Sequence, residues 1–171
     1  FIQSATEESI ETILEMAEKK AKAQCKKLVV TGCMVQRYGQ SLEGELPEVD
    51  FFLGTGEYHR LGEILKNSSV QQRSFVDTPM YIHDEFAKRV PSWKSHSAYL
   101  KISEGCNHRC AFRIIPTLRG KLRSRSIPSL VAEAEGLVKN GVKEINLVSQ
   151  DSTSYGRDLK DGTGLGGLLR A

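Results

Sequence analysis

Residues 98–110 read AYLKISEGCNHRC. In the first half of this stretch Leu100 and Ile102 alternate with polar side chains, a pattern typical of a β-strand with one buried face. The second half is a loop that carries Cys106 and Cys110. Functional side chains of parallel α/β sheets gather just past the carboxyl ends of the strands. We therefore expect the cysteine loop to form part of a functional site.

The segment that follows predicts a helix and a second strand. Pro128 is suited to the first turn of a helix, apolar residues then recur at helical spacing, and Asn140-Gly141 ends the pattern. KEINLVS, residues 143–149, has the character of the next strand. Strand, loop, helix and strand within about 50 residues indicate a βαβ crossover with parallel strands. The tail GTGLGGLLRA predicts a further loop and the first turn of a helix.

The N-terminal third shows the same alternation of helices and strands. Helical spacing over residues 5–24 is followed by an apolar strand, residues 26–33, that ends at Cys33. A second apolar run, residues 49–56, precedes a helix over residues 57–67. This order predicts an α/β fold with a parallel sheet. We expect three parts: an α/β domain over 1–66, a linker over 67–97 with at most a short strand or helix, and a second α/β part over 98–171.

Composition excludes several classes of protein. With 39% hydrophobic and 26% charged residues in 171, the chain suits a soluble globular protein, and it has no apolar run long enough for a transmembrane helix. Its net charge of +3 is too small to indicate nucleic-acid binding by itself. However, six Arg and Lys side chains and no acid lie within residues 109–125, which predicts a locally positive surface.

The N-terminus and the cysteines indicate the compartment. The first residues, FIQSATEESI, are acidic and unlike a signal peptide, and no initiator Met is present, so we expect the chain to begin inside a longer protein. Four cysteines without a secretory signal are typical of a reducing compartment, where thiols more often bind metal or carry redox chemistry than form disulfides. We therefore expect a cytoplasmic protein with no membrane contact.

The spacing of the cysteine loop is close to that of an iron–sulfur site. Three thiolates spaced C-x3-C-x2-C hold three irons of a 4Fe-4S cluster and leave the fourth iron open to a substrate. This loop supplies Cys106 and Cys110 at that spacing, but Arg113 stands at the third position. Taken alone, the two cysteines favour an ordinary thiol pair, with half of a zinc site that includes His108 as the alternative.

The wider sequence resembles the methylthiotransferase branch of the radical S-adenosylmethionine (SAM) enzymes. The resemblance rests on KISEGCNHRCAFRIIPTLRGKLRSRSI (101–127) and GVKEINLVSQDSTSYG (141–156). It extends upstream to VTGCMVQRYG and FLGTGEYHRL, and so covers almost the whole chain. IIPTLRG and SQDSTSYG are similar to the branch that modifies a ribosomal protein, whereas the sibling that modifies tRNA adenosine usually has wording closer to IVPYTRG and GQNVNAYG.

The resemblance implies roles for five residues. Cys106 and Cys110 would be two of the three ligands of the radical SAM 4Fe-4S cluster, and Phe112 would lie near the bound nucleoside. Gln150 would contact the methionine part of SAM. Cys33 would be a ligand of an auxiliary 4Fe-4S cluster whose other two cysteines lie upstream of this sequence.

The resemblance also implies an architecture and an activity. Residues 1–66 would be part of the family's N-terminal domain, and residues 98–171 the first βα units of a radical SAM barrel, with segments missing at both ends. Two such units alone would leave an open sheet edge and a half-covered core. The implied reaction uses SAM and an electron donor to add a methylthio group to the β-carbon of an aspartate in ribosomal protein S-twelve, free or within the small ribosomal subunit.

Arg113 disagrees with this implied chemistry. A guanidinium offers only hydrogen-bond donors and stays protonated, so it does not ligate iron. We therefore expect that the chain as written does not hold a stable catalytic cluster and is impaired as an enzyme, whether the arginine is natural, engineered or a sequence error. Two alternatives stay open: the tRNA-modifying sibling, and a non-catalytic paralogue that binds ribosome or RNA through the basic loop 119–125.

Overall fold

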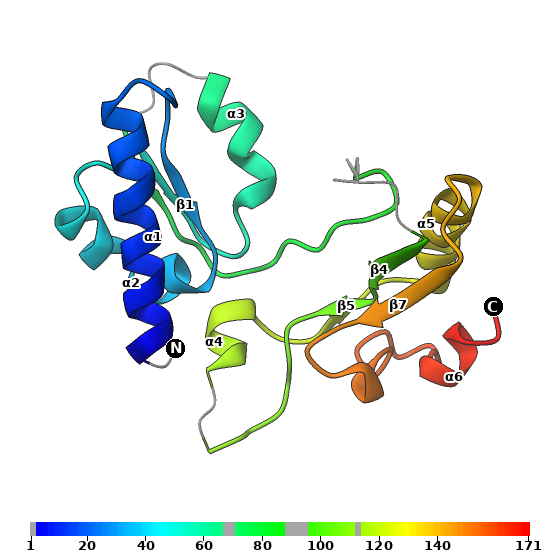
Figure 1. Cartoon of the computed structure of the whole chain (residues 1–171). Helices are drawn as coiled ribbons and strands as arrows, with labels where there is room; N and C mark the ends of the chain where they lie inside the picture. Colours follow the sequence, from blue (N-terminus) through cyan, green and yellow to red (C-terminus); the bar gives the residue numbers. More distant parts are fainter. Residues whose placement is uncertain (1–2, 67–70, 88–95, 112–113) are drawn as a thin grey trace. The chain divides into compact units, whose positions relative to one another are not determined.

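The computed structural model of the chain describes residues 3–66, 71–87, 96–111 and 114–171. The fold divides into two units, Phe1–Tyr81 and Ile82–Ala171, each of which combines helices with short parallel strands (Figure 1). This confirms the α/β class. The boundary falls inside the segment predicted to be a linker, and the assignment of domains on either side of it stays a prediction. Within the described ranges, no helix has the length and apolar character needed to cross a membrane.

Unit 1 contains a three-stranded parallel sheet. Its elements are α1 (Gln3–Ala21), β1 (Val29–Thr31), α2 (Cys33–Glu45), β2 (Phe51–Leu53), η1 (Tyr58–Arg60), α3 (Leu61–Lys66) and β3 (Ser74–Phe75). The strands follow the order β1-β2-β3, with Val30 opposite Phe52 and Leu53 opposite Phe75. Cys33 is the first residue of α2, directly after β1 and Gly32. The predicted strand therefore ends two residues earlier than expected.

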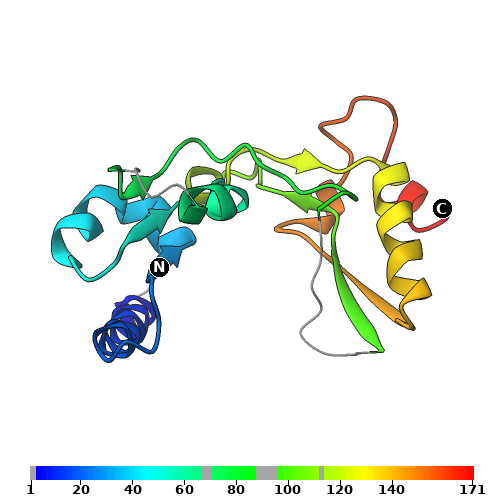
Figure 2. The same ribbon diagram turned by 90° about the horizontal axis from the view of Figure 1, so that it is seen from above.

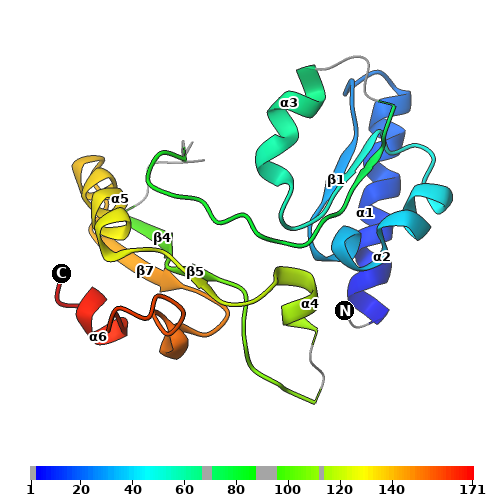
Figure 3. The same cartoon turned by 180° about the vertical axis from the view of Figure 1, so that it is seen from behind.

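Successive residues of β2 fill cores on opposite faces of this sheet. Phe52 packs with Ile13 of α1 and Val35 of α2, whereas Phe51 and Leu53 pack with the apolar side of α3. Because strand side chains alternate between faces, three consecutive apolar residues indicate a strand that is covered on both sides. Figures 1 and 3 show the result, with α1 and α3 on opposite sides of β1.

The connection after α3 belongs to unit 1 as far as Tyr81. Leu53 of β2 pairs with Phe75 of β3, and the amide of the next residue, Gly54, donates to the Phe75 carbonyl over 2.8 Å. Further along, the Gln36 amide group donates to the Asp77 carbonyl, and the Tyr81 ring stacks on His59 with ring centroids 4.2 Å apart. A third strand therefore forms from residues in which the sequence alone showed no sustained period.

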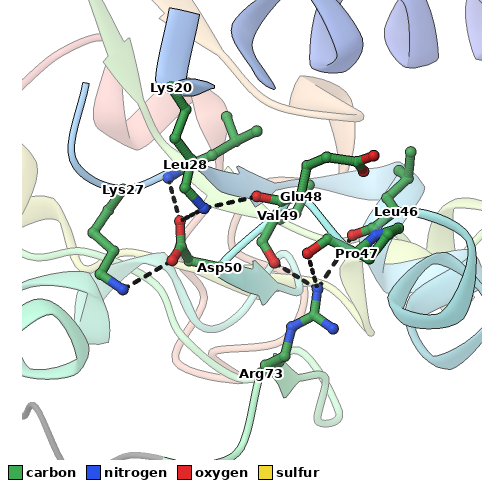
Figure 4. A network of polar contacts seen from close by, with 9 residues as sticks. All are labelled: Lys20, Lys27, Leu28, Leu46, Pro47, Glu48, Val49, Asp50 and Arg73. Carbon is green, nitrogen blue, oxygen red and sulfur yellow. Dashed lines mark hydrogen bonds and ion pairs between the residues drawn. The ribbon is translucent and has the colours of Figure 1, made fainter. Parts of the chain in front are cut away.

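Asp50 joins α1 to the sheet of unit 1. Its carboxylate accepts hydrogen bonds from Lys20 Nζ (2.5 Å), Lys27 Nζ (2.8 Å) and the Leu28 amide (2.8 Å), as Figure 4 shows. Nearby, the guanidinium of Arg73 donates to the carbonyls that precede β2, including that of Val49 (2.6 Å). Burial alone would raise the pKa of Asp50, but the bonds from Lys20 and Lys27 outweigh it and lower the pKa to about 2.

Unit 2 is built on a parallel pair of strands joined by a helix. Its elements are β4 (Ser97–Lys101), β5 (Ser103–Glu104), α4 (Ile115–Arg119), β6 (Arg123–Ser124), α5 (Ile127–Lys139), β7 (Glu144–Val148), η2 (Ser152–Ser154) and α6 (Leu165–Leu168). β4 pairs with β7 in parallel, while β5 pairs with β6 in antiparallel fashion. The predicted βαβ crossover is therefore present as β4–α5–β7. The single strand expected over 98–103 is divided into β4 and β5.

Helix α5 covers one face of the β4–β7 pair. Ser126 caps its first turn by accepting a hydrogen bond from the Ser129 amide, and Pro128 follows within that turn. Leu130 of the helix packs with Leu100, Ile102 and the buried ring of Tyr155. In Figure 2 the yellow helix runs alongside the green strand β4 and the orange strand β7. The crossover therefore brings the ends of β4 and β7 to the same edge of the pair.

The Asp50 network predicts a pH-dependent contribution to stability. Replacing Asp50 with Asn should lower the free energy of unfolding at pH 7 by about 2 kcal/mol, because the folded-state pKa lies well below the ordinary value of 3.8. The stabilisation is complete above the unfolded-state pKa and is lost as the pH falls through the folded-state pKa. The difference between the two proteins in denaturant unfolding should therefore shrink from pH 7 to pH 3.

Glu48→Gln is the matched control for this prediction. Glu48 is exposed, and its backbone carbonyl, which the substitution keeps, accepts the bond from Lys20. It should change stability by less than about 0.5 kcal/mol at either pH. Equal destabilisation by the two substitutions would contradict the role given to Asp50.

Candidate functional site

The cysteine loop leaves β5 at the carboxyl end of the β4–β7 pair. Cys106 is buried and Cys110 is exposed. The Cys106 amide donates to the Gly120 carbonyl over 3.2 Å, and the side-chain oxygen of Asn107 accepts from the Leu122 amide over 3.1 Å. The residues next to Cys106 are therefore fixed to the segment that leads into β6.

Gly105 allows this close approach of two backbones. It has a φ of +81°, and a side-chain carbon built on it would lie 2.2 Å from the Lys121 carbonyl oxygen and 2.6 Å from that of Gly120. Both the conformation and the space require glycine at this position. The turn into the cysteine loop therefore depends on the absence of a side chain at residue 105.

Glu104 is a buried carboxylate beside the loop. It accepts hydrogen bonds from Lys101 Nζ (2.5 Å) and the Gln150 amide nitrogen (2.9 Å), and the Arg119 guanidinium lies 3.5 Å away. Burial would raise the pKa of Glu104, but the hydrogen bond and charge of Lys101, with the charge of Arg119, lower it. Glu104 is therefore ionised, and its carboxylate fixes the side-chain amide of Gln150.

A second contact joins the loop to the residues after β7. His108 Nε2 lies 2.6 Å from Asp151 Oδ2. Asp151 also accepts bonds from the amide and hydroxyl of Thr153 and from the hydroxyl of Ser154. The bonds from Ser154, Thr153 and His108 together hold the pKa of Asp151 well below its ordinary value. Asp151 is therefore a fixed anion at the carboxyl end of β7.

Among the described residues, three polar atoms at the same edge lack a hydrogen-bond partner. Ser103 Oγ, Ser149 Oγ and Gln150 Oε1 are buried and form no hydrogen bond with any described residue. Ser103 begins β5, and Ser149 and Gln150 come directly after β7. Buried polar atoms are rarely left unsatisfied, so this edge suits a polar ligand that would complete their hydrogen bonds.

The structure brings some of the predicted residues together. Cys106 and Gln150 are linked through Glu104 at one edge of unit 2, whereas Cys33 lies in unit 1 as a half-buried thiol. Phe112 and Arg113 fall outside the described residues. Among those that are described, no group of three His, Cys, Asp or Glu side chains is arranged to hold a metal ion. His108, considered above as a zinc ligand, contacts Asp151.

Within residues 119–125, the basic side chains contribute less positive surface than their number predicts. Arg125 is buried and forms an ion pair with Glu133 over 2.5 Å. The guanidinium of Arg123 is half-buried and donates to the carbonyls of Arg119 and Lys121. Lys121 is the one exposed cation of residues 119–125. Arg123 and Arg125 therefore stabilise the fold of this segment, and they leave little positive charge exposed for binding RNA.

Sequence reasoning missed the partners of the loop. Nothing in the local sequence marks Glu104 or Arg125 as buried ions, because their burial follows from tertiary packing, in which Gln150 contacts Glu104 from 46 residues away and Glu133 pairs with Arg125 from 8 residues away. Asp151 had a local signal: an Asp followed by Ser-Thr-Ser is typical of a side chain that caps a short helical turn. Its contact with His108 requires the β4–β7 pairing and has no local signature.

Comparisons with known proteins agree with this architecture. A family model described as "Uncharacterized protein family UPF0004" matches residues 1–54. Over all 171 residues the chain is 53% identical to a Myxococcus xanthus protein named "Ribosomal protein uS12 methylthiotransferase RimO", of which it covers 36%. A protein of the same name from Geobacter sulfurreducens is 48% identical over 99% of the chain and 38% of its own length. The chain is therefore similar, over nearly its whole length, to proteins named as RimO methylthiotransferases.

The RimO similarity confirms the resemblance found in the cysteine loop and in the residues after β7. It extends over both structural units, since the alignment to the Myxococcus protein covers the whole chain. The chain spans little more than a third of the length of these RimO relatives. Its donor set departs from a three-thiolate site, because Arg113 occupies the position that the C-x3-C-x2-C spacing reserves for a thiolate.

Gly105→Ala should displace the cysteine loop. We expect the substitution to destabilise unit 2 by about 3 kcal/mol, because it adds a clash with two carbonyl oxygens to the strain of a positive φ. Gly141→Ala is the control: Gly141 also has a positive φ, of +94°, but open space around it. It should cost only about 1 kcal/mol. Urea unfolding measures both, and equal costs would contradict the proposed close approach at Gly105.

Proposed function

We propose that this chain forms part of a cytoplasmic radical SAM methylthiotransferase that modifies ribosomal protein uS12, and that Arg113 impairs it. The observation that carries the proposal is the edge of the β4–β7 pair, where the cysteine loop meets Gln150 through Glu104. The names of the relatives support uS12 as the substrate. The implied product carries a methylthio group on the β-carbon of an aspartate, and the reaction would draw on an electron donor.

SAM fits the polar edge of unit 2. The amide nitrogen of Gln150 is bonded to Glu104, so its buried Oε1 is left to accept a bond from a ligand such as the ammonium group of SAM. The hydroxyls of Ser103 and Ser149 either donate or accept, which suits the carboxylate of the same ligand. Phe112 would lie against the nucleoside. SAM would supply the methyl group.

The donor set of this chain does not fit the catalytic 4Fe-4S cluster. Cys106 and Cys110 offer two thiolates, and Arg113 adds a cation in place of the third. The auxiliary cluster would draw one thiolate from Cys33, and the described residues include no group of three His, Cys, Asp or Glu side chains that could hold a metal ion there. We therefore expect the unmodified chain to bind iron and sulfide poorly.

Restoring the third thiolate tests the proposal. After anaerobic reconstitution with iron and sulfide, Arg113→Cys should hold about four irons per chain, and the unmodified chain less than half as many. The measurements are iron and sulfide content per chain and the charge-transfer absorption of the cluster. SAM added to the reconstituted variant should change its low-temperature electron paramagnetic resonance spectrum, because SAM binds the open iron.

Arg109→Cys is the matched control. It also replaces an arginine of the loop with cysteine, here the exposed Arg109, but it leaves position 113 unchanged. It should bind no more iron than the unmodified chain. Equal content of about four irons in the unmodified chain and in Arg113→Cys would refute the role given to Arg113.

A further inference from the structure

Two adjacent residues in the segment after β7 contact the chain on both sides of Cys106. Glu104 lies two residues before Cys106 and accepts a bond from Gln150, over 2.9 Å. His108 lies two residues after it and contacts Asp151, over 2.6 Å. Gln150 and Asp151 are adjacent in the sequence. The segment that carries the buried cysteine is therefore attached at both of its ends to one short stretch.

That stretch is itself fixed in position. β7 pairs with β4 in a register that places Lys101 opposite Val148, and the Ile102 amide donates to the Val148 carbonyl over 3.0 Å. Asp151 is further held by the amide and hydroxyl of Thr153, over 3.1 and 2.7 Å. The contacts with Gln150 and Asp151 therefore restrict the loop, because they attach it to a firm part of the sheet.

The contact at His108 reaches the sulfur of Cys106. The backbone amide of His108 donates to Cys106 Sγ over 3.4 Å, so any shift of His108 changes the surroundings of the thiol. On the opposite side, the Cys106 amide is bonded to the Gly120 carbonyl, and Gly105 leaves no space for a shift toward Lys121. Cys110 lies beyond His108 and is exposed.

We infer that Gln150 and Asp151 are positioning residues that clamp Glu104 and His108 and so fix the Cys106 thiol in the chain without iron. The two cysteines of the loop are then unequal: Cys106 is buried and held, whereas Cys110 is free to react. This inference goes beyond the proposed function, because it concerns the placement of a thiol and holds with or without a cluster or SAM.

Alkylation of the individual cysteines tests the clamp. The 171-residue chain, fully reduced and free of metal, is treated with iodoacetamide, and the rate at each cysteine is measured by mass spectrometry of its peptides. In the unmodified chain Cys106 should react at least about tenfold more slowly than Cys110, because it becomes accessible only through local opening. Equal rates at the two cysteines would overturn the inference.

Removing one clamp contact should release Cys106 selectively. His108 is largely exposed, at 56% of its side-chain surface, so His108→Gln disturbs no core and should leave the fold intact. It should raise the Cys106 rate by about threefold to tenfold and leave the Cys110 rate unchanged. Asp151→Asn should have a similar effect. In the double variant, Cys106 should react no faster than in the faster single variant, because the two substitutions break the same contact between His108 and Asp151.

Asp161→Asn is the matched control, since Asp161 caps Thr163 in the same manner as Asp151 caps Thr153 but lies outside the clamp. It should leave the Cys106 rate unchanged. Unchanged Cys106 rates in His108→Gln, or additive effects in the double variant, would overturn the inference. If Asp151→Asn fails to fold, His108→Gln decides alone. Because no iron or SAM is used, the outcome does not depend on the proposed function.

Discussion

The parallel pairing of β4 with β7 is the constraint on which the candidate site depends. Its register places Leu100 opposite Leu147 and Lys101 opposite Val148. The residues that follow the two strands therefore leave the sheet side by side at the same edge. Glu104 and Gln150 are 46 residues apart in the chain and meet only because of this pairing. Helix α5 maintains it by burying Leu130 against Leu100 and Ile102. The chemistry of the edge is therefore a consequence of apolar packing some distance away.

The periodicity of the sequence predicted the elements that local patterns determine. The crossover β4–α5–β7 was found because Pro128, the apolar helical face and Asn140-Gly141 mark the helix, and because a strand on either side of such a helix pairs in parallel. β3 lies within the segment where a short strand or helix was allowed, but its position was not predicted, because two residues carry no period and its pairing with β2 lies in the tertiary structure. The division of the strand at Ile102 was missed for the same reason.

The candidate site was predictable in part. Cys106 and Gln150 were singled out by motif, and both lie at the edge that strand order indicates. The ionic partners were hidden, because a buried Glu104 or Arg125 looks in sequence like any surface charge until its partner is known. The similarity to the RimO proteins and the departure at Arg113 carry different information. Identity near 50% reports on the scaffold, whereas iron ligation depends on single side chains.

The attachment of residues 74–81 to unit 1 has a consequence for evolution. Because β3 pairs with β2, the Asp77 carbonyl accepts a bond from Gln36 and the Tyr81 ring stacks on His59, a change of length within this segment would displace the contacts that follow it. Relatives of this chain should therefore keep the length of residues 74–81. The stretch open to insertions is shorter than the interval between the last helix of one unit and the first strand of the next.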